Sequence, residues 1–232
     1  MYAAATLGGA TTPSRFAATA ARYGYDGVVL FDSVESAANT DIDTVVDRYN
    51  IDVVTGANLH TTDRSRVGGM IRAVRDDVEI VRAIGATPAI ARTLAEQDRL
   101  DVLRWPLDRD DIPHTVVKSA QDHGIAIELN LASVLRRAGT PRVRAIDRLA
   151  DVTNVLDHYA IPMVVTTDAQ THLELRAPRE VQAVGDVIGI PGDRIAAGLE
   201  HWGKIAARTR RIRDDRFIEP GVRRIDNETD DR

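Results

Sequence analysis

Short apolar runs alternate with amphipathic helical segments along most of the chain, and this alternation constrains the fold more than any other feature. In the run Asp26–Phe31, for example, almost every residue after Asp26 is apolar, and such runs are rich in β-branched residues. Strands buried on both faces have this composition, and they occur in parallel sheets that helices cover. The sequence therefore predicts an α/β fold built on a parallel sheet.

The periodicity places seven strands and seven helices. The expected strands are Tyr2–Leu7, Asp26–Phe31, Ile51–Leu59, Thr87–Ala91, Asp101–Trp105, Ile125–Leu129 and Pro162–Thr166. The expected helices are Pro13–Tyr23, Asp41–Tyr49, Ser65–Ile84, Pro113–His123, Arg144–Tyr159, Pro178–Ile188 and Leu199–Arg213. The helix at Ser65–Ile84 has the strongest pattern, because its apolar residues recur at steps of three and four. Thr12-Pro13 supplies a typical helix start for the first one.

Such a sheet can close into a barrel or stay open. An open doubly wound sheet commonly has a GxGxxG loop after its first strand, and Leu7-Gly8-Gly9-Ala10-Thr11 lacks that spacing. We therefore expect a TIM-barrel-like (β/α) barrel of seven to eight parallel strands in a single domain. Residues 1–200 would form the barrel, residues 201–224 a basic C-terminal helix and extension packed on it, and residues 225–232 an acidic disordered tail.

Composition excludes several classes of protein. No apolar run approaches the roughly 18 residues that span a membrane. The chain has no cysteine, so we expect no disulfide framework, and the cytoplasm is the expected compartment. The formal net charge of −5 argues against indiscriminate nucleic-acid binding. Twenty-eight of the 30 basic residues are arginine, which suits a salt-rich cytoplasm or a GC-rich genome equally.

Charge is distributed unevenly along the chain. Residues 201–224 carry eight basic and three acidic side chains, whereas the tail carries four acids and one arginine, which leaves −7 on residues 1–200. Trp202, Ile205, Thr209 and Ile212 form one stripe of the last helix, which we expect to pack on the barrel. Lys204, Arg208 and Arg211 form a basic stripe beside it. This stripe either pairs with the acidic body or meets RNA or an acidic partner.

Polar residues follow several expected strands, where barrel enzymes carry their chemistry. They are Asp32, Asn58, His60, Arg92, Glu128, Asn130, Asp168 and His172. Two interpretations stay open, a hydrolytic metal site or polar caps that bind loop backbone. The first strand offers no ligand and the chain has no His-x-His pair, so we expect no bound metal. No Gly-x-Ser-x-Gly or Walker motif supports acyl transfer or nucleotide hydrolysis.

Two arginine clusters follow the expected strands at Ile125–Leu129 and Pro162–Thr166. Arg136, Arg137, Arg142 and Arg144 lie in the first cluster, and Arg176 and Arg179 lie in the second. Both loops would lie on one rim of a barrel, where arginines are typical of phosphate-backbone contacts. Arg136, Arg137, Arg142, Arg176 and Arg179 are the resulting RNA-contact candidates. Ion pairing with Asp147, Glu174 and Glu180 is the alternative.

Three segments together resemble archaeal ribonuclease P protein component 3. They are Tyr23-Gly24-Tyr25-Asp26-Gly27-Val28-Val29-Leu30, Ile127-Glu128-Leu129-Asn130-Leu131 with its arginine loop, and Val164–Ala169 followed by Glu174–Val181. Their order and spacing match that family across about residues 20–200. The first strand is richer in alanine than the family pattern, and the basic segment and acidic tail do not align with that pattern, so the resemblance implies no function for them.

The resemblance implies a barrel related to the PHP-type metallohydrolases and a role in removing the 5′ leader from precursor tRNA. The RNA subunit would cleave with bound magnesium, and this chain would be a non-catalytic scaffold that binds no cofactor itself. Its implied partners are ribonuclease P protein component 2, the other protein subunits and the ribonuclease P RNA, with precursor tRNA contacted indirectly. Asp32, His60, Glu128 and Asp168 would then mark a vestigial rim site.

The sequence alone is also compatible with a second function. A free-standing barrel phosphoesterase could use Glu128, Asp168 and the arginine rim on a small phosphorylated substrate. Such an enzyme would hydrolyse phosphate esters by itself with added divalent metal, whereas a ribonucleoprotein subunit would need catalytic RNA and partner proteins.

Overall fold

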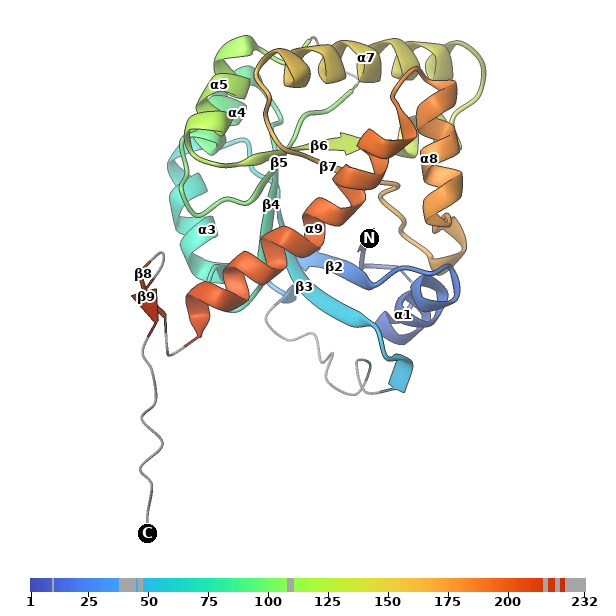
Figure 1. Cartoon of the computed structure of the whole chain (residues 1–232). Coiled ribbons are helices and arrows are strands. Elements are labelled where there is room, and N and C mark those ends of the chain that lie inside the picture. The colour runs from blue at the N-terminus through green and yellow to red at the C-terminus, as the bar shows by residue number, and fades with distance from the viewer. Residues whose placement is uncertain are drawn as a thin grey trace.

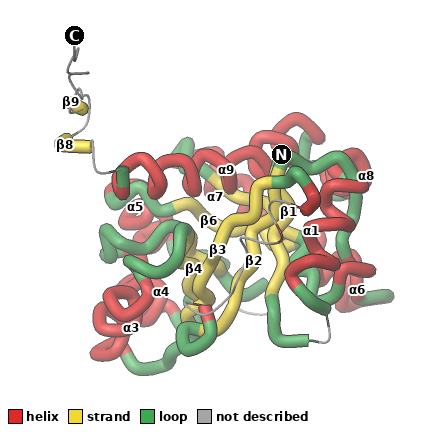
Figure 2. Tube along the Cα trace, turned by 90° about the horizontal axis from the view of Figure 1, so that it is seen from below, coloured by secondary structure: helices red, strands yellow, loops and turns green. Residues whose placement is uncertain are grey.

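The computed structural model contains one parallel sheet of seven strands that curls into a nearly closed barrel (Figures 1 and 2). It describes residues 1–9, 11–37, 45, 48–107, 111–214, 217–219 and 222–223. Neighbouring strands follow the order of the chain, and every pair is parallel. The barrel strands are β1 (Tyr2–Thr6), β2 (Gly27–Ser33), β3 (Asp52–Leu59), β4 (Ile80–Ile84), β5 (Val102–Arg104), β6 (Ala126–Asn130) and β7 (Met163–Thr166).

The first and last strands nearly close the barrel. An isolated parallel bridge pairs Ala5 with Ala169, and the amide of Thr6 donates to the carbonyl of Ala169 at 2.9 Å. The hydroxyl of Thr166 also donates to the carbonyl of Ala4 at 3.3 Å. The predicted barrel of seven to eight strands is therefore confirmed, with seven.

Helices surround the sheet (Figure 1). They are α1 (Pro13–Arg22), α3 (Val67–Val74), α4 (Pro88–Ala95), α5 (His114–Asp122), α6 (Ala132–Arg136), α7 (Gly139–His158), α8 (Pro178–Val187) and α9 (Gly192–Arg213), with 3-10 turns η2 (Arg64–Arg66) and η3 (His172–Glu174). A short antiparallel pair, β8 (Phe217–Glu219) and β9 (Val222–Arg223), follows α9. The helix expected at Asp41–Tyr49 lies mostly outside the described residues.

Two expected elements are wrong. The predicted helix at Ser65–Ile84 ends at Val74, and its last part is strand β4. The predicted strand at Thr87–Ala91 is instead the beginning of α4, whose first turn is capped by the hydroxyl of Thr87, 3.2 Å from the amide of Ile90. The count of seven strands survives only because one error removed a strand and the other added one.

The apolar core has two layers. A large cluster fills the space between the outer face of the sheet and the surrounding helices. A second cluster fills the barrel interior, and each of the seven strands contributes to it. It comprises Ala4, Val29, Phe31, Val54, Ile80, Val102, Ala126 and Val164, together with Trp202, Ile205 and Ala206 of α9.

Helix α9 crosses the end of the barrel at which the strands begin (Figure 1). Trp202 is fully buried against the interior cluster, and its indole nitrogen donates to the carbonyl of Val165 at 2.8 Å. Ile205 and Thr209 are also buried, as the stripe predicts, but Ile212 is 54% exposed. The helix begins at Gly192, so the domain boundary expected after residue 200 falls inside it.

Arginines of α9 bind acidic residues at the beginnings of the strands. Arg208 contacts Asp101 at 2.8 Å, and both terminal nitrogens of Arg210 bond Asp52 at 2.9 Å. Pairing with the acidic body is thus the role of Arg208, whereas Lys204 and Arg211 are exposed. The tail at residues 225–232 lies outside the described residues, so its expected disorder stays a prediction.

Candidate functional site

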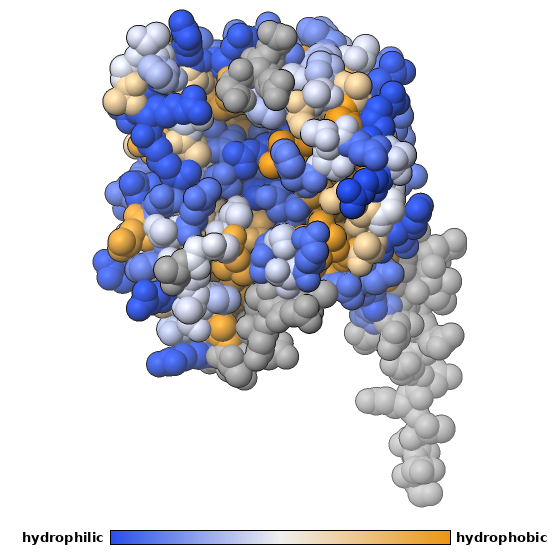
Figure 3. All heavy atoms as spheres, turned by 180° about the vertical axis from the view of Figure 1, so that it is seen from behind, coloured by the Kyte–Doolittle hydropathy of each residue, from blue (hydrophilic) through white to orange (hydrophobic). Residues whose placement is uncertain are grey.

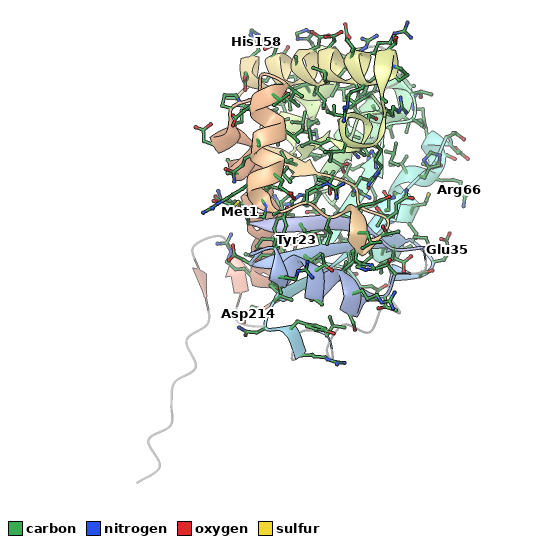
Figure 4. All side chains as sticks on the ribbon, turned by 90° about the vertical axis from the view of Figure 1, so that its right-hand side faces the viewer. Met1, Tyr23, Glu35, Arg66, His158 and Asp214 are labelled. Carbon is green, nitrogen blue, oxygen red and sulfur yellow. The ribbon has the colours of Figure 1, made fainter. Side chains whose placement is uncertain are left out.

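The candidate site lies inside the barrel at the end where the strands finish. Figure 4 shows Met1 and Asp214 at one end of the molecule, and Glu35 and Arg66, which follow β2 and β3, at the other. Side chains on a strand alternate between faces, so every second residue points into the barrel. Near the end at which the strands finish, these interior positions change from apolar to charged or polar residues.

Arg82 on β4 is the centre of this polar layer. Its side chain is only 1% exposed. One terminal nitrogen lies 3.2 Å from an oxygen of Glu128 and 3.6 Å from one of Asp168. The other donates to the hydroxyl of Thr6 at 3.1 Å, and Nε donates to the side-chain oxygen of Asn58 at 3.4 Å. Side chains from β1, β3, β4 and β6, and from Asp168 two residues after β7, thus meet at one guanidinium.

An aromatic ring supports the guanidinium from below. The Arg82 guanidinium carbon lies 3.9 Å from the centre of the Phe31 ring, a distance at which cation–π attraction is strong in a dry interior. Phe31 can lie across the barrel because β3 has a glycine beside it. A Cβ on Gly56 would meet the ring at 2.5 Å. The ring in turn packs edge-on against Trp202 at 5.5 Å, which connects the charged layer to the closing helix.

Arg104 on β5 supplies the second positive charge. It donates to Asp168 at 2.8 Å, and its Nε lies 3.7 Å from Glu128. The side-chain amide of Asn130 donates to the same oxygen of Glu128 at 3.0 Å, and its side-chain oxygen accepts from the amide of Ala132, which begins α6. Two guanidiniums therefore balance two carboxylates, and the buried charge of the layer sums to zero. These four charged side chains can be buried together because each has a partner of opposite charge.

Asp168 has an unusual backbone and a shifted pKa. Burial by itself raises the pKa of this carboxyl, but the nearby Arg104 and Arg82 guanidiniums outweigh it, so the pKa lies below its usual value. Its φ of 47° is left-handed, which costs energy for a non-glycine residue. Hydrogen bonds hold it there, since its amide donates to Thr166 at 2.8 Å and Thr6 donates to its carboxylate at 3.1 Å.

An open cavity of about 410 Å³ lies over this layer at the barrel mouth. Asn58, Arg104, Asn130 and Asp168 form part of its wall, and Trp105, Arg137 and Gln170 contribute from the loops. A second cavity of about 630 Å³ adjoins it along α7 and shares Leu107, Ser133 and Arg137 with it. The mouth is therefore accessible, although the charged groups beneath it are already paired.

The structure brings together only part of the expected rim site. Glu128 and Asp168 meet in the charged layer, with Asn58 and Asn130 beside them. Asp32 and His60, the other two residues of the expected rim site, form no hydrogen bond or ion pair with this layer. Asp32 accepts the amide of Ser33 at 2.7 Å, and His60 is exposed at the end of β3.

The two other expected rim residues lie apart from the layer as well. Arg92 lies on the exposed face of α4, where it pairs with Glu96. His172 lies in η3, where its Nδ1 is 3.5 Å from the hydroxyl of Thr11. Neither side chain therefore belongs to the charged layer.

Three of the five arginines expected to contact RNA bond the protein's own backbone. Arg136 donates to the carbonyls of Thr167 and Asp168 and pairs with Glu174 at 2.9 Å. Arg142 donates to the carbonyl of Val134 at 2.7 Å. Arg176 donates to the carbonyls of Leu173 and Leu175, at 3.1 and 2.9 Å. Arg136 with Glu174 is therefore an ion pair of the kind expected under the alternative.

The other two candidates face solvent. The side chains of Arg137 and Arg179 are exposed, and neither forms a hydrogen bond or ion pair with any residue that the structure describes. Arg137 lies at the barrel mouth, whereas Arg179 lies in the first turn of α8. They therefore do not share one surface.

The residues present do not fit a metal of the kind that PHP-type barrels would hold. Within the described ranges, no group of three or more His, Asp or Glu side chains converges on a point. The two buried carboxylates instead face the nitrogens of Arg82 and Arg104. A divalent cation there would have to displace a guanidinium that already neutralises them.

Comparison with known proteins gives consistent results. The family model described as RNase P subunit p30 matches residues 6–214. Ribonuclease P protein component 3 of Halobacterium salinarum is 40% identical over 217 residues, which are 93% of each chain. The protein of the same name from Natronomonas pharaonis is 38% identical over 225 residues, 96% of this chain and 94% of that one.

Two solved structures share the fold. A chain in the cryo-EM structure of archaeal ribonuclease P with mature tRNA superposes with a TM-score of 0.83 at 19% identity, covering 97% of this chain and 99% of that one. Histidinol phosphate phosphatase from Lactococcus lactis, solved with zinc, L-histidinol and phosphate, gives a TM-score of 0.55 at 8% identity, with 82% and 94% covered. Among the described residues, no helix is long and apolar enough to cross a membrane.

Proposed function

The chain belongs to the RNase P subunit p30 family, and from this premise we propose that it is a protein subunit of ribonuclease P, the ribonucleoprotein that removes the 5′ leader from precursor tRNA. The observation that carries the proposal is the extent of the match, which covers residues 6–214 of 232 and extends over more than nine-tenths of relatives that bear the subunit's name. Its partners would be the ribonuclease P RNA, protein component 2 and the other subunits. The compartment would be the cytoplasm.

The barrel mouth supports a non-catalytic role for the chain itself. A general acid or base must be able to exchange a proton with a substrate, and a nucleophile must reach it. Glu128 is buried beneath two arginines, and the same guanidiniums hold Asp168 in its ionised form. We therefore propose that the chain supplies no catalytic group and no metal or cofactor, and that magnesium bound by the RNA serves the cleavage step.

The phosphoesterase alternative needs Glu128 and Asp168 as free carboxylates. Both are neutralised, and the arginines expected to bind phosphate are mostly bonded to backbone carbonyls. No observation on the site favours that function over the subunit role.

Purification of the tagged chain from its own cells tests the proposal. We expect ribonuclease P RNA, with partner subunits, to co-purify at 0.1–0.2 M salt, and the RNA to be identified by sequencing. The untagged strain serves as the control. Recovery of the folded chain with no RNA enriched over that control would refute the subunit role.

A further inference from the structure

The two adjoining cavities form one continuous depression on the mouth side of the barrel, which we name the α7 groove. The mouth cavity and the cavity along α7 share Leu107, Ser133 and Arg137. Figure 3 shows this side of the molecule, where hydrophilic residues gather in the middle of the face. Each cavity has the volume of a typical ligand site.

Two arginine side chains of the groove have no bonding partner among the described residues. Arg137 and Arg144 line the larger cavity and are exposed, and neither side chain forms a hydrogen bond or ion pair with a described residue. They contrast with Arg136 and Arg142, which bond carbonyls, and with Arg148 of the same cavity, which pairs with Asp111. An unpaired guanidinium presents a planar set of donors that matches a phosphate.

The charge of the groove differs from that of the barrel around it. The described charged residues of the larger cavity are three arginines and two aspartates; Arg148 pairs with Asp111, so Arg137 and Arg144 balance Asp147 and Asp151. Residues 1–200 as a whole carry −7 by sequence. An anion approaching this acidic chain would therefore meet less repulsion in the groove than over the rest of residues 1–200.

The groove also lacks the features of a protein-binding surface. Protein interfaces depend on exposed aromatic or aliphatic anchors. The large exposed apolar side chains of the described residues are Val143, Leu173, Val187 and Ile212, and none lines either cavity. The wall from Pro141 to Asp151 spans about 15 Å of helix. This length accommodates about four stacked nucleotides at a rise of about 3.4 Å each.

We propose that the α7 groove binds a single-stranded segment of RNA by its phosphates, with Arg137 and Arg144 as the principal contacts. The proposal rests on the proposed function, because that function supplies an RNA partner. It replaces the wider arginine rim with one surface, and it adds Arg144, which the sequence places in the same cluster without distinguishing it.

Salt-dependent binding of an unstructured RNA tests the proposal. The probe is a fluorescein-labelled ten-nucleotide uridine oligomer, titrated with the full-length chain from 0.05 to 0.5 M salt. Arg137→Gln/Arg144→Gln should lower the slope of log K against log salt by about 1.4, since each single-strand phosphate contact contributes about 0.7. That change corresponds to roughly 25-fold weaker binding at about 0.1 M salt.

The matched control is Arg72→Gln/Arg179→Gln, which removes the same charge from exposed arginines outside the groove. It should leave the slope unchanged. Equal losses of RNA affinity in the two double variants would overturn the proposal, because they would show that only the total charge of the chain matters. Wild-type slope and affinity in the groove variant would overturn it too.

A thiol footprint identifies the occupant in the assembled particle. The chain has no cysteine, so Ser133→Cys creates a single thiol in the wall that both cavities share. We expect ribonuclease P RNA to slow its alkylation by iodoacetamide at least tenfold. Protection by partner protein without RNA would instead make the groove a protein interface and overturn the proposal. Failure of the proposed function is recognised separately, by a tagged chain that recovers no RNA.

Discussion

Replacement of Arg82 by methionine is expected to lower the free energy of unfolding by about 3–5 kcal/mol. Methionine fills much of the same volume, so the loss comes mainly from Glu128 and Asp168, which would lose a buried partner at 3.2 and 3.6 Å. Arg104 alone would then face two carboxylates. Urea denaturation followed by circular dichroism measures the change.

Two controls make this result specific to the buried layer. Arg92→Met removes an exposed arginine that pairs with Glu96 four residues later, and it should cost less than about 0.5 kcal/mol. Arg82→Met/Glu128→Gln restores the charge balance and should cost less than the sum of its single changes. An Arg82→Met cost no greater than that of Arg92→Met would show that the layer contributes nothing to stability.

Replacement of Trp202 by alanine is expected to cost about 3–5 kcal/mol as well. The indole is fully buried at the end of the barrel, where it contacts Phe31 and donates to the carbonyl of Val165. Its removal opens a cavity under the charged layer and leaves that carbonyl without its donor. For a chain of this size the melting temperature should fall by roughly 6–20 °C, measured by scanning calorimetry.

Ile212→Ala is the matched control on the same helix. Ile212 continues the apolar spacing of Trp202 but is exposed, so its loss should change stability by less than about 0.5 kcal/mol. Similar melting temperatures for the two variants would mean that α9 does not close the barrel.

The alternation of strands and helices predicted the barrel, because parallel strands buried on both faces have a distinctive composition. The largest error was β4. Val74, Val78 and Val81 continue a helical spacing across the break, and this concealed a strand in which Ile80, Arg82 and Ile84 point inward while Val81 and Ala83 point outward. Two adjacent aspartates, Asp76 and Asp77, are the available signal that the helix has ended.

The error in β4 also explains why the central residue of the site was missed. An arginine on an amphipathic helix is expected to be exposed, whereas the same arginine on an inward-facing strand position must find buried partners. Glu128 and Asp168 were identified as strand-end residues, but their partner could not be found without the correct strand. The expectation of no bound metal rested on missing ligands and stays a prediction; the structure shows that Arg82 and Arg104 neutralise the two buried carboxylates.

The second error, at Thr87–Ala91, was avoidable. Thr12-Pro13 was recognised as a helix start, and Thr87-Pro88 is the same signal. Both begin helices, and Thr87 makes the capping hydrogen bond. The roles of the arginines, by contrast, could not be predicted from composition, because only the folded backbone shows which carbonyls Arg136, Arg142 and Arg176 reach.

The most direct test of the central claim is an omission experiment on reconstituted ribonuclease P. Cleavage of precursor tRNA is measured with the ribonuclease P RNA and the other protein subunits at limiting magnesium, with and without this chain. We expect the chain to increase the cleavage rate and to show no cleavage or phosphate-ester hydrolysis by itself. An unchanged rate on omission, or cleavage by the chain in the absence of RNA, would contradict a non-catalytic subunit role.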